Sequence, residues 1–446
     1  MGNNEKYEML AEGETLVPSN MGIIPAEKNF TFSENSIKKS LADSKYFELK
    51  SFVKSEEPDN SYEAEISYLD EVFSVKLDVL PVEYIGLNDF GFANQIDKAD
   101  FENALTQPNY LEISMFFGDS VLDSFHLQLK IMDAVVPQAS LVVDFMSYRM
   151  LSAKWLKMTA KSPTPPSPDY LFSLHGVYND KGAKTQYWFH THGLLRCKSI
   201  DLEILGISNG AEQMNDLITM VVKKFIKDPT KENEKFQIGY DGLGIHLAWL
   251  RWEEAIKDFP SGLLGGMDDR EGDNNVHTEP SGVLFAVEEN TLVSPEIFVK
   301  TLADNPIFYI SNEETSRMSD LARERFSFFK DVFVKYGEKP KPKSFFSKIF
   351  GSKKDENTEP WDFLVKLGLS VDHDEAGTEK EHLWFRIQNV ENGKITGELL
   401  NQPYWISGLN AGDVNSYSTS VLTDWLIYSP DGGSYTPDSI YRLGYT

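Results

Sequence analysis

Residues 186–194, Gln-Tyr-Trp-Phe-His-Thr-His-Gly-Leu, decide how the middle of the chain folds. In an extended strand, side chains two residues apart lie on the same face. Trp188, His190 and His192 therefore share one face of a strand, and the residues between them share the other. An indole beside two imidazoles suits a half-buried strand. We expect a structurally central strand whose polar face lines a pocket or a packed polar layer.

The segments around this strand alternate between strand and helix periodicity. A serine at position 33 precedes helically spaced apolar residues, as a helix cap does. The expected strands are 64–69, 72–82, 111–117, 140–145, 171–177, 186–195, 200–206, 244–250 and 283–287, and the expected helices are 33–47, 121–134, 148–160, 210–227 and 311–336. The sequence therefore predicts an α+β fold with mixed and antiparallel sheets and flanking helices.

A chain of 446 residues is too long for one core, because single cores stop growing at roughly 250–300 residues. The expected divisions are an N-terminal α+β region at 1–100, a main α+β domain at 101–337, a basic Pro/Lys linker at 338–360 and a small β-rich domain at 361–446. In the last of these, apolar residues alternate before Asn392-Gly393, which is typical of a tight hairpin turn. We expect a mostly antiparallel β-roll or barrel there.

Composition restricts the classes of partner and compartment. The chain has 43 Lys+Arg against 69 Asp+Glu, a formal net charge of −26. This surplus repels phosphate backbones, so nucleic acid is not an expected partner. Cys197 is the only cysteine, which fits a reducing compartment. The N-terminus shows no signal peptide and no apolar run reaches about 20 residues, so we expect a cytoplasmic protein without integral membrane association.

The two histidines of the central strand are the strongest candidates for a metal site. Because His190 and His192 share a face, both imidazoles can reach one ion. A third ligand is needed, and Glu203, His175 and Cys197 are the candidates, each depending on strand pairings that the sequence does not fix. Zinc with an open position would activate a bound water for hydrolysis. Without a fixed third ligand, we expect the strand to be metal-free.

Other catalytic patterns are missing from the sequence. It has no phosphate-binding loop, no Gly-x-Gly-x-x-Gly between a strand and a helix, and no nucleophile elbow. Cys197 has no base at a recognisable spacing, and the acidic residues 267–273 do not match a calcium loop. No catalytic residue is therefore identified, and no cofactor is expected.

Two parts of the chain resemble uncharacterised bacterial families. The segment 188–194, with Trp155 upstream and residues 201–203 downstream, resembles a family that carries a Trp-x-His-Thr-His-Gly-Leu strand. The end of the chain resembles a second bacterial domain of unknown function, through Glu381-His382-Leu383-Trp384-Phe385, Gly393, Gly397-Glu398-Leu399, Asn401-Gln402-Pro403, Gly412-Asp413-Val414 and Asp424-Trp425. Neither resemblance implies an activity. The second domain also resembles small β-rich immunity proteins that neutralise toxins, which is an analogy of size and pattern.

Three functional hypotheses follow. The first is a non-catalytic protein-binding module, immunity-like in character, whose acidic surface and C-terminal β-domain engage a protein partner. The second is a metal-dependent hydrolase that uses His190 and His192. The third is a peripheral membrane adaptor that uses the basic, partly apolar residues 339–354.

Overall fold

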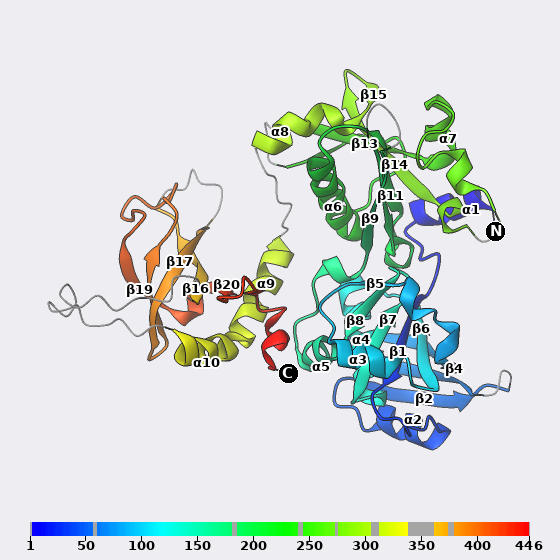
Figure 1. The fold of residues 1–446 in the computed structure, drawn as a ribbon, viewed down its shortest axis with the longest axis horizontal. Coiled ribbons are helices and arrows are strands. Elements are labelled where there is room, and N and C mark those ends of the chain that lie inside the picture. The colour runs from blue at the N-terminus through cyan, green and yellow to red at the C-terminus, as the bar shows by residue number, and fades with distance from the viewer. Residues whose placement is uncertain are drawn as a thin grey trace. The chain divides into compact units, whose positions relative to one another are not determined.

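The computed structural model describes residues 2–56, 60–180, 185–239, 244–272, 275–304, 312–337, 361–372 and 379–445. The chain divides into two compact units, Met1–Tyr309 and Ile310–Thr446 (Figure 1). The expected linker at 338–360 lies outside the described residues, as does the membrane-adaptor segment within it. None of the described helices is both long and apolar enough to span a bilayer.

The first half of the larger unit is built on an eight-stranded sheet (Figure 1). Only the β5–β8 pair is parallel among its described pairings; the rest are antiparallel. In sheet order the strands are β2 (Glu48–Lys54), β3 (Ser61–Tyr68), β4 (Glu71–Pro81), β6 (Asn109–Met115), β1 (Ser19–Pro25), β7 (Ala139–Asp144), β8 (Arg149–Ser152) and β5 (Gly91–Phe92). The sheet thus takes strands from both sides of the division expected at residue 100, because β1 pairs with β6 and β7.

Helices cover this sheet. They are α2 (Glu34–Ala42), α3 (Lys98–Ala104), α4 (Val121–Val135) and α5 (Ala153–Lys161). Helix α4 is the most deeply buried: the Ser120 hydroxyl accepts from the Asp123 amide at its start, and Pro137 follows its end. Helix α5 begins later than the expected helix 148–160, because residues 149–152 pair with β7 as strand β8. Burial against the sheet therefore overrode the helical pattern at that end.

The second half of the larger unit is built on a seven-stranded sheet (Figure 1). Its strands are β12 (Phe236–Ile238), β13 (Ile245–Arg251), β14 (Ser281–Glu288), β11 (Asp201–Ile207), β10 (Gln186–His192) and β9 (Ser173–Asn179) in order, with β15 (Thr291–Val293) beside β14. The β11–β14 pair is parallel, so residues far apart in the sequence meet in the middle of the sheet. The main core lies between this sheet and α6 (Ala211–Lys227), and Tyr7 of α1 (Asn3–Ala11) joins it.

The two halves of this unit are joined by a buried ion pair. The Arg196 guanidinium donates to both carboxylate oxygens of Asp144, at 2.9 and 2.6 Å, and to the Ser19 hydroxyl at 3.0 Å. It also donates to the carbonyl of Leu171 at 2.8 Å. Both charged side chains are almost fully buried, at 0% and 1% exposure. Two direct contacts and two further hydrogen bonds help such a buried pair to offset its desolvation.

The smaller unit contains a six-stranded antiparallel sheet. Its strands are β19 (Val414–Ser418), β18 (Lys394–Leu399), β17 (Lys380–Glu391), β16 (Asp362–Ser370), β20 (Leu422–Tyr428) and β21 (Ser434–Tyr435). Two helices, α9 (Asn312–Glu324) and α10 (Phe326–Tyr336), accompany it. The Trp425 indole donates to the carbonyl of Ala322 at 3.0 Å and so ties β20 to α9.

The helix expected at 311–336 is instead two helices that meet at Arg325. The Arg325 guanidinium is buried and donates to the carbonyl of Pro437 at 2.8 Å. The α+β class, the mixed and antiparallel sheets and the small antiparallel C-terminal domain are all confirmed.

The ion pair between the halves yields a stability prediction. Asp144→Asn leaves the Arg196 charge buried without its counter-ion, so the free energy of unfolding should fall by about 3–5 kcal/mol. The double variant Asp144→Asn/Arg196→Met should lose less than the sum of the two single losses, because the uncompensated charge is gone. Urea unfolding of the full chain measures both.

The control is Lys98→Met, which removes one partner of the exposed pair with Glu102. It should change the free energy of unfolding by less than about 0.5 kcal/mol. Equal losses for Lys98→Met and Asp144→Asn, or additive losses in the double variant, would contradict a coupled buried pair.

Candidate functional site

Strand β10 brings an unusual set of rings to one face of its sheet. His190 pairs directly with His175 of β9 on one side and with Glu203 of β11 on the other. Directly paired residues project to the same face, so this row crosses three strands. His192 lies two residues further along β10 and joins the same face.

The three imidazoles form a nearly equilateral triangle. Their ring centroids are 5.3 Å apart for His175 and His190, 5.0 Å for His175 and His192, and 5.0 Å for His190 and His192. One nitrogen from each ring lies within 4.8 Å of the other two. A tetrahedral ion at about 2.1 Å from each nitrogen needs the nitrogens about 3.4 Å apart, so the three would have to move closer together to bind one ion.

Burial keeps these imidazoles neutral. It lowers the pKa of His190 to about 2 and that of His192 to about 3, with a smaller contribution from the neighbouring histidines. It also lowers the pKa values of His175 and His277. Neutral imidazole is the form that binds metal ions. The Nδ1 atom of His190 is buried and has no hydrogen-bond partner among the described residues.

Glu203 is held by three donors rather than left free. Its carboxylate accepts from the Trp188 indole at 2.7 Å and from Arg270 at 2.6 Å, and it also accepts from the Ser281 hydroxyl. All of these groups are buried. The carboxylate therefore fixes the indole that lies beside the His190 ring, tilted against it at a ring distance of 4.3 Å.

Arg270 also positions a fourth histidine. Its guanidinium donates to the carbonyl of His277 at 2.7 Å and to that of Gly265 at 3.1 Å. The His277 ring then lies 4.7 Å from the His190 ring and 5.6 Å from the His192 ring. One charged side chain thus binds Glu203 and holds the loop that carries His277.

A small pocket opens beside the histidines. It has a cavity volume of about 20 Å³, and its lining includes His190, His192, His277 and Glu279. That volume accommodates about one water molecule. From the other half of the unit, Tyr148 lies edge-on to His192 at a ring distance of 5.0 Å.

The turn after β10 depends on a glycine. Gly193 has a φ of +113°, and a Cβ atom there would lie 2.5 Å from the carbonyl oxygen of Leu171. Asp201 accepts from the Thr191 hydroxyl at 2.9 Å and from the Leu194 amide at 3.2 Å. Burial raises the pKa of Asp201 to about 7. These contacts fix the end of β10, and therefore the position of His192.

The structure brings together some of the candidates from the sequence and separates others. His190, His192 and His175 converge, whereas Glu203 faces the cluster with its oxygens engaged by other donors. Cys197 lies outside the cluster; it is buried, and burial raises its thiol pKa to about 12. His277 was missed, because it reaches the site through a loop 85 positions after His192 and carries no local signal.

Replacing the glycine tests how tightly this turn is specified. Gly193→Ala combines a positive φ with a backbone clash, so unfolding free energy should fall by about 2–4 kcal/mol in urea unfolding. Gly262→Ala is the matched control: its φ is +76°, but nothing lies within 4 Å of the new Cβ atom. The control should lose only about 1 kcal/mol. Similar losses in both variants would mean that the contact with Leu171 does not constrain the turn.

Comparison with known proteins places these parts in families. Neither curated proteins nor solved structures give a match. Family models match residues 19–166 as the N-terminal part, and 174–285 as the C-terminal part, of a protein of unknown function (DUF4026). Residues 342–442 match an uncharacterized protein conserved in bacteria (DUF2314). The histidine cluster lies entirely within residues 174–285. Because the two DUF4026 models together match more than half of the chain, the chain belongs to the DUF4026 family and carries a DUF2314 domain.

Proposed function

We propose that the chain binds a divalent transition-metal ion of the zinc class through His175, His190 and His192, and that this centre is hydrolytic. The observation that carries the proposal is the triangle of three neutral imidazoles on one face of β9 and β10. Imidazole nitrogen is a preferred zinc ligand. The unpartnered Nδ1 atom of His190 supports it, because a buried polar atom without a partner is costly unless something binds it.

A hydrolytic centre is favoured over a purely structural one by the number of ligands. Structural zinc sites are closed by four protein ligands, whereas catalytic sites have three and keep one position for water. Among the described residues the candidate group has three members. The adjoining cavity of about 20 Å³ has room for one water, and a metal ion lowers the pKa of such a water toward about 7.

The surrounding residues have supporting roles in this proposal. Glu203 and Arg270 position the indole of Trp188 and the loop that carries His277. His277 lines the same pocket and is the imidazole placed to accept a proton from a water bound there. We therefore assign Glu203 to positioning rather than to the metal, in contrast to its candidacy from the sequence.

The sequence favoured a metal-free strand, since no third ligand could be assigned without the strand pairing. The register of β9 against β10 supplies one, because His175 lies directly opposite His190. This register is the reason for preferring the metal hypothesis here.

Metal binding can be measured directly. Protein loaded with Zn²⁺ and then freed of excess should retain about one ion per chain by elemental analysis. The Co²⁺ form should show the strong visible absorption of tetrahedral cobalt, and azide should change that spectrum by entering the open position. His175→Gln, His190→Gln and His192→Gln should each weaken metal binding by roughly 100-fold or more, because each removes a ligand.

His246→Gln is the matched control, because His246 lies on β13 outside the cluster. It should retain the ion. His277→Gln should also retain the ion while slowing hydrolysis of activated esters such as 4-nitrophenyl acetate. Absence of stoichiometric metal in the loaded parent would refute the site, and a cobalt spectrum insensitive to azide would refute the open position.

We further propose, as the sequence suggested, that the C-terminal β-domain binds a cytoplasmic protein partner. Two aromatic side chains support this: Tyr404 is 89% exposed and Trp405 is 39% exposed. The Glu381 carboxylate accepts from both of their backbone amides, at 2.8 and 3.0 Å, so the loop is held while the rings stay available. Exposed aromatic residues on a fixed backbone are frequent binding hot spots.

Photo-crosslinking in cells tests the second proposal. A benzophenone amino acid at position 404 should give one discrete cross-linked protein species. The control places the same benzophenone amino acid at position 394. Lys394 is exposed at the start of β18, next to the hairpin turn, and this variant should give no discrete cross-linked species. Identical patterns at the two positions, or no discrete species at position 404, would argue against a binding role for this loop.

A further inference from the structure

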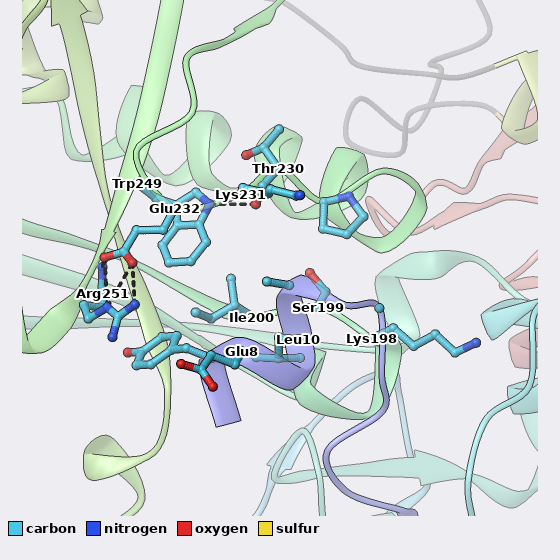
Figure 2. A pocket seen from close by; sticks show the side chains of 14 residues that line it. Glu8, Leu10, Lys198, Ser199, Ile200, Thr230, Lys231, Glu232, Trp249 and Arg251 are labelled. Atoms are coloured by element: carbon cyan, nitrogen blue, oxygen red, sulfur yellow. Dashed lines mark hydrogen bonds and ion pairs between the residues drawn. The ribbon is translucent and has the colours of Figure 1, made fainter. Parts of the chain in front are cut away.

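A second and larger pocket lies beside the N-terminal helix α1. Figure 2 shows the Trp249 indole on one side of it, Ile200 and Leu10 below it, and the segment 229–231 above it. Its cavity volume is about 240 Å³. None of its lining residues lines the pocket at the histidine cluster, so the two sites are distinct.

The pocket wall contains a buried hydroxyl without a partner. Ser199 is 2% exposed, and its Oγ atom has no hydrogen-bond partner in the part of the chain that the structure describes. In Figure 2 this hydroxyl is directed into the space between the indole and the segment 229–231. The Oγ1 atom of Thr230, another lining residue, is likewise buried without a partner among the described residues. Buried hydroxyls are normally hydrogen-bonded, so this wall is suited to a ligand that supplies the missing group.

Apolar side chains form another part of the wall. The side chains of Leu10, Ile200 and Trp249 contribute hydrocarbon and a flat aromatic surface. The Trp249 indole has already used its only donor, which bonds the carbonyl of Thr230 at 2.9 Å. An aromatic ring of a ligand would gain both apolar burial and contact with the indole here.

The charged lining residues do not favour a charged ligand deep in the pocket. The Arg251 guanidinium is neutralised by Glu232, with contacts of 2.6–3.0 Å. Lys198 points away from the cavity in Figure 2, and Lys231 and Glu8 are exposed at its rim. A buried carboxylate or ammonium would therefore lose its hydration without gaining a buried counter-charge.

We infer that this pocket is a binding site for a small uncharged molecule with one aromatic ring and one hydroxyl group, recognised by the Ser199 hydroxyl. The volume supports this size: a cavity of about 150 Å³ holds benzene, so about 240 Å³ holds one ring with substituents. The apolar walls account for the ring, and the unpartnered hydroxyl accounts for the polar group.

The test is a titration followed by ¹⁹F NMR with three probes of similar size: 4-fluorophenol, fluorobenzene and 4-fluorobenzoate. The full chain should bind 4-fluorophenol saturably and about fivefold more tightly than fluorobenzene, the ratio expected for one hydrogen bond. It should bind 4-fluorobenzoate most weakly. Ser199→Ala should remove the preference for the phenol while leaving fluorobenzene binding unchanged, and Leu10→Trp should abolish binding of all three by filling the cavity.

Ser61→Ala is the matched control, because Ser61 is also a fully buried serine without a partner among the described residues, but it lies on β3 in the other sheet. It should keep the phenol preference. Circular dichroism verifies that each variant is folded. If the Leu10→Trp variant does not fold, the result for Ser199→Ala alone decides the outcome. Absence of saturable binding, tightest binding of the benzoate, or a phenol preference that survives in Ser199→Ala would overturn the inference.

Discussion

The buried pair between Arg196 and Asp144 is the interaction on which the larger unit depends. It lies where the eight-stranded and seven-stranded sheets meet. Both side chains are buried, so water cannot replace a hydrogen bond that is lost there. The same guanidinium holds the carbonyl of Leu171, whose oxygen packs against Gly193 at the end of β10. The joint between the halves thus also sets the end of the strand that carries the histidines, and a change at Asp144 is expected to reach the site through this route.

Glu203 has a similar role inside the seven-stranded sheet. Its carboxylate binds Trp188 and Arg270 on the histidine side and Ser281 on the other. The backbone of Ser281 in turn exchanges hydrogen bonds with the Tyr7 hydroxyl of α1. A continuous chain of hydrogen bonds therefore runs from the histidine cluster to the helix that walls the Ser199 pocket. The parallel pairing of β11 with β14 makes this possible, since it places Glu203 beside residues some 80 positions later.

Periodicity alone predicted much of this architecture, including the central strand, the helix 210–227 and the antiparallel C-terminal domain. It did not predict β1 (Ser19–Pro25), because this short strand contains Gly22 and ends in proline, yet it lies in the middle of its sheet. For the site, alternation placed His190 and His192 on one face. Which of Glu203, His175 and Cys197 would join them depended on register, which is set by pairing across the sheet rather than by local residue preference. Predicting the position of His277 required the path of the loop that Arg270 holds, and residue periodicity does not predict the path of a loop.

The packing of like rings is the strongest physical argument for a ligand at the histidines. At Arg196 and Asp144 two opposite charges meet, and the guanidinium donates to both carboxylate oxygens, to Ser19 and to Leu171, although its Nε atom has no partner among the described residues. At the histidine cluster, several imidazoles lie against one another, burial suppresses their charge, and a buried nitrogen of His190 stays without a partner among the described residues. Such an arrangement costs free energy unless a ligand offsets it. A metal ion would offset the cost at once, because it supplies a positive charge to every nitrogen that the sheet has turned toward it.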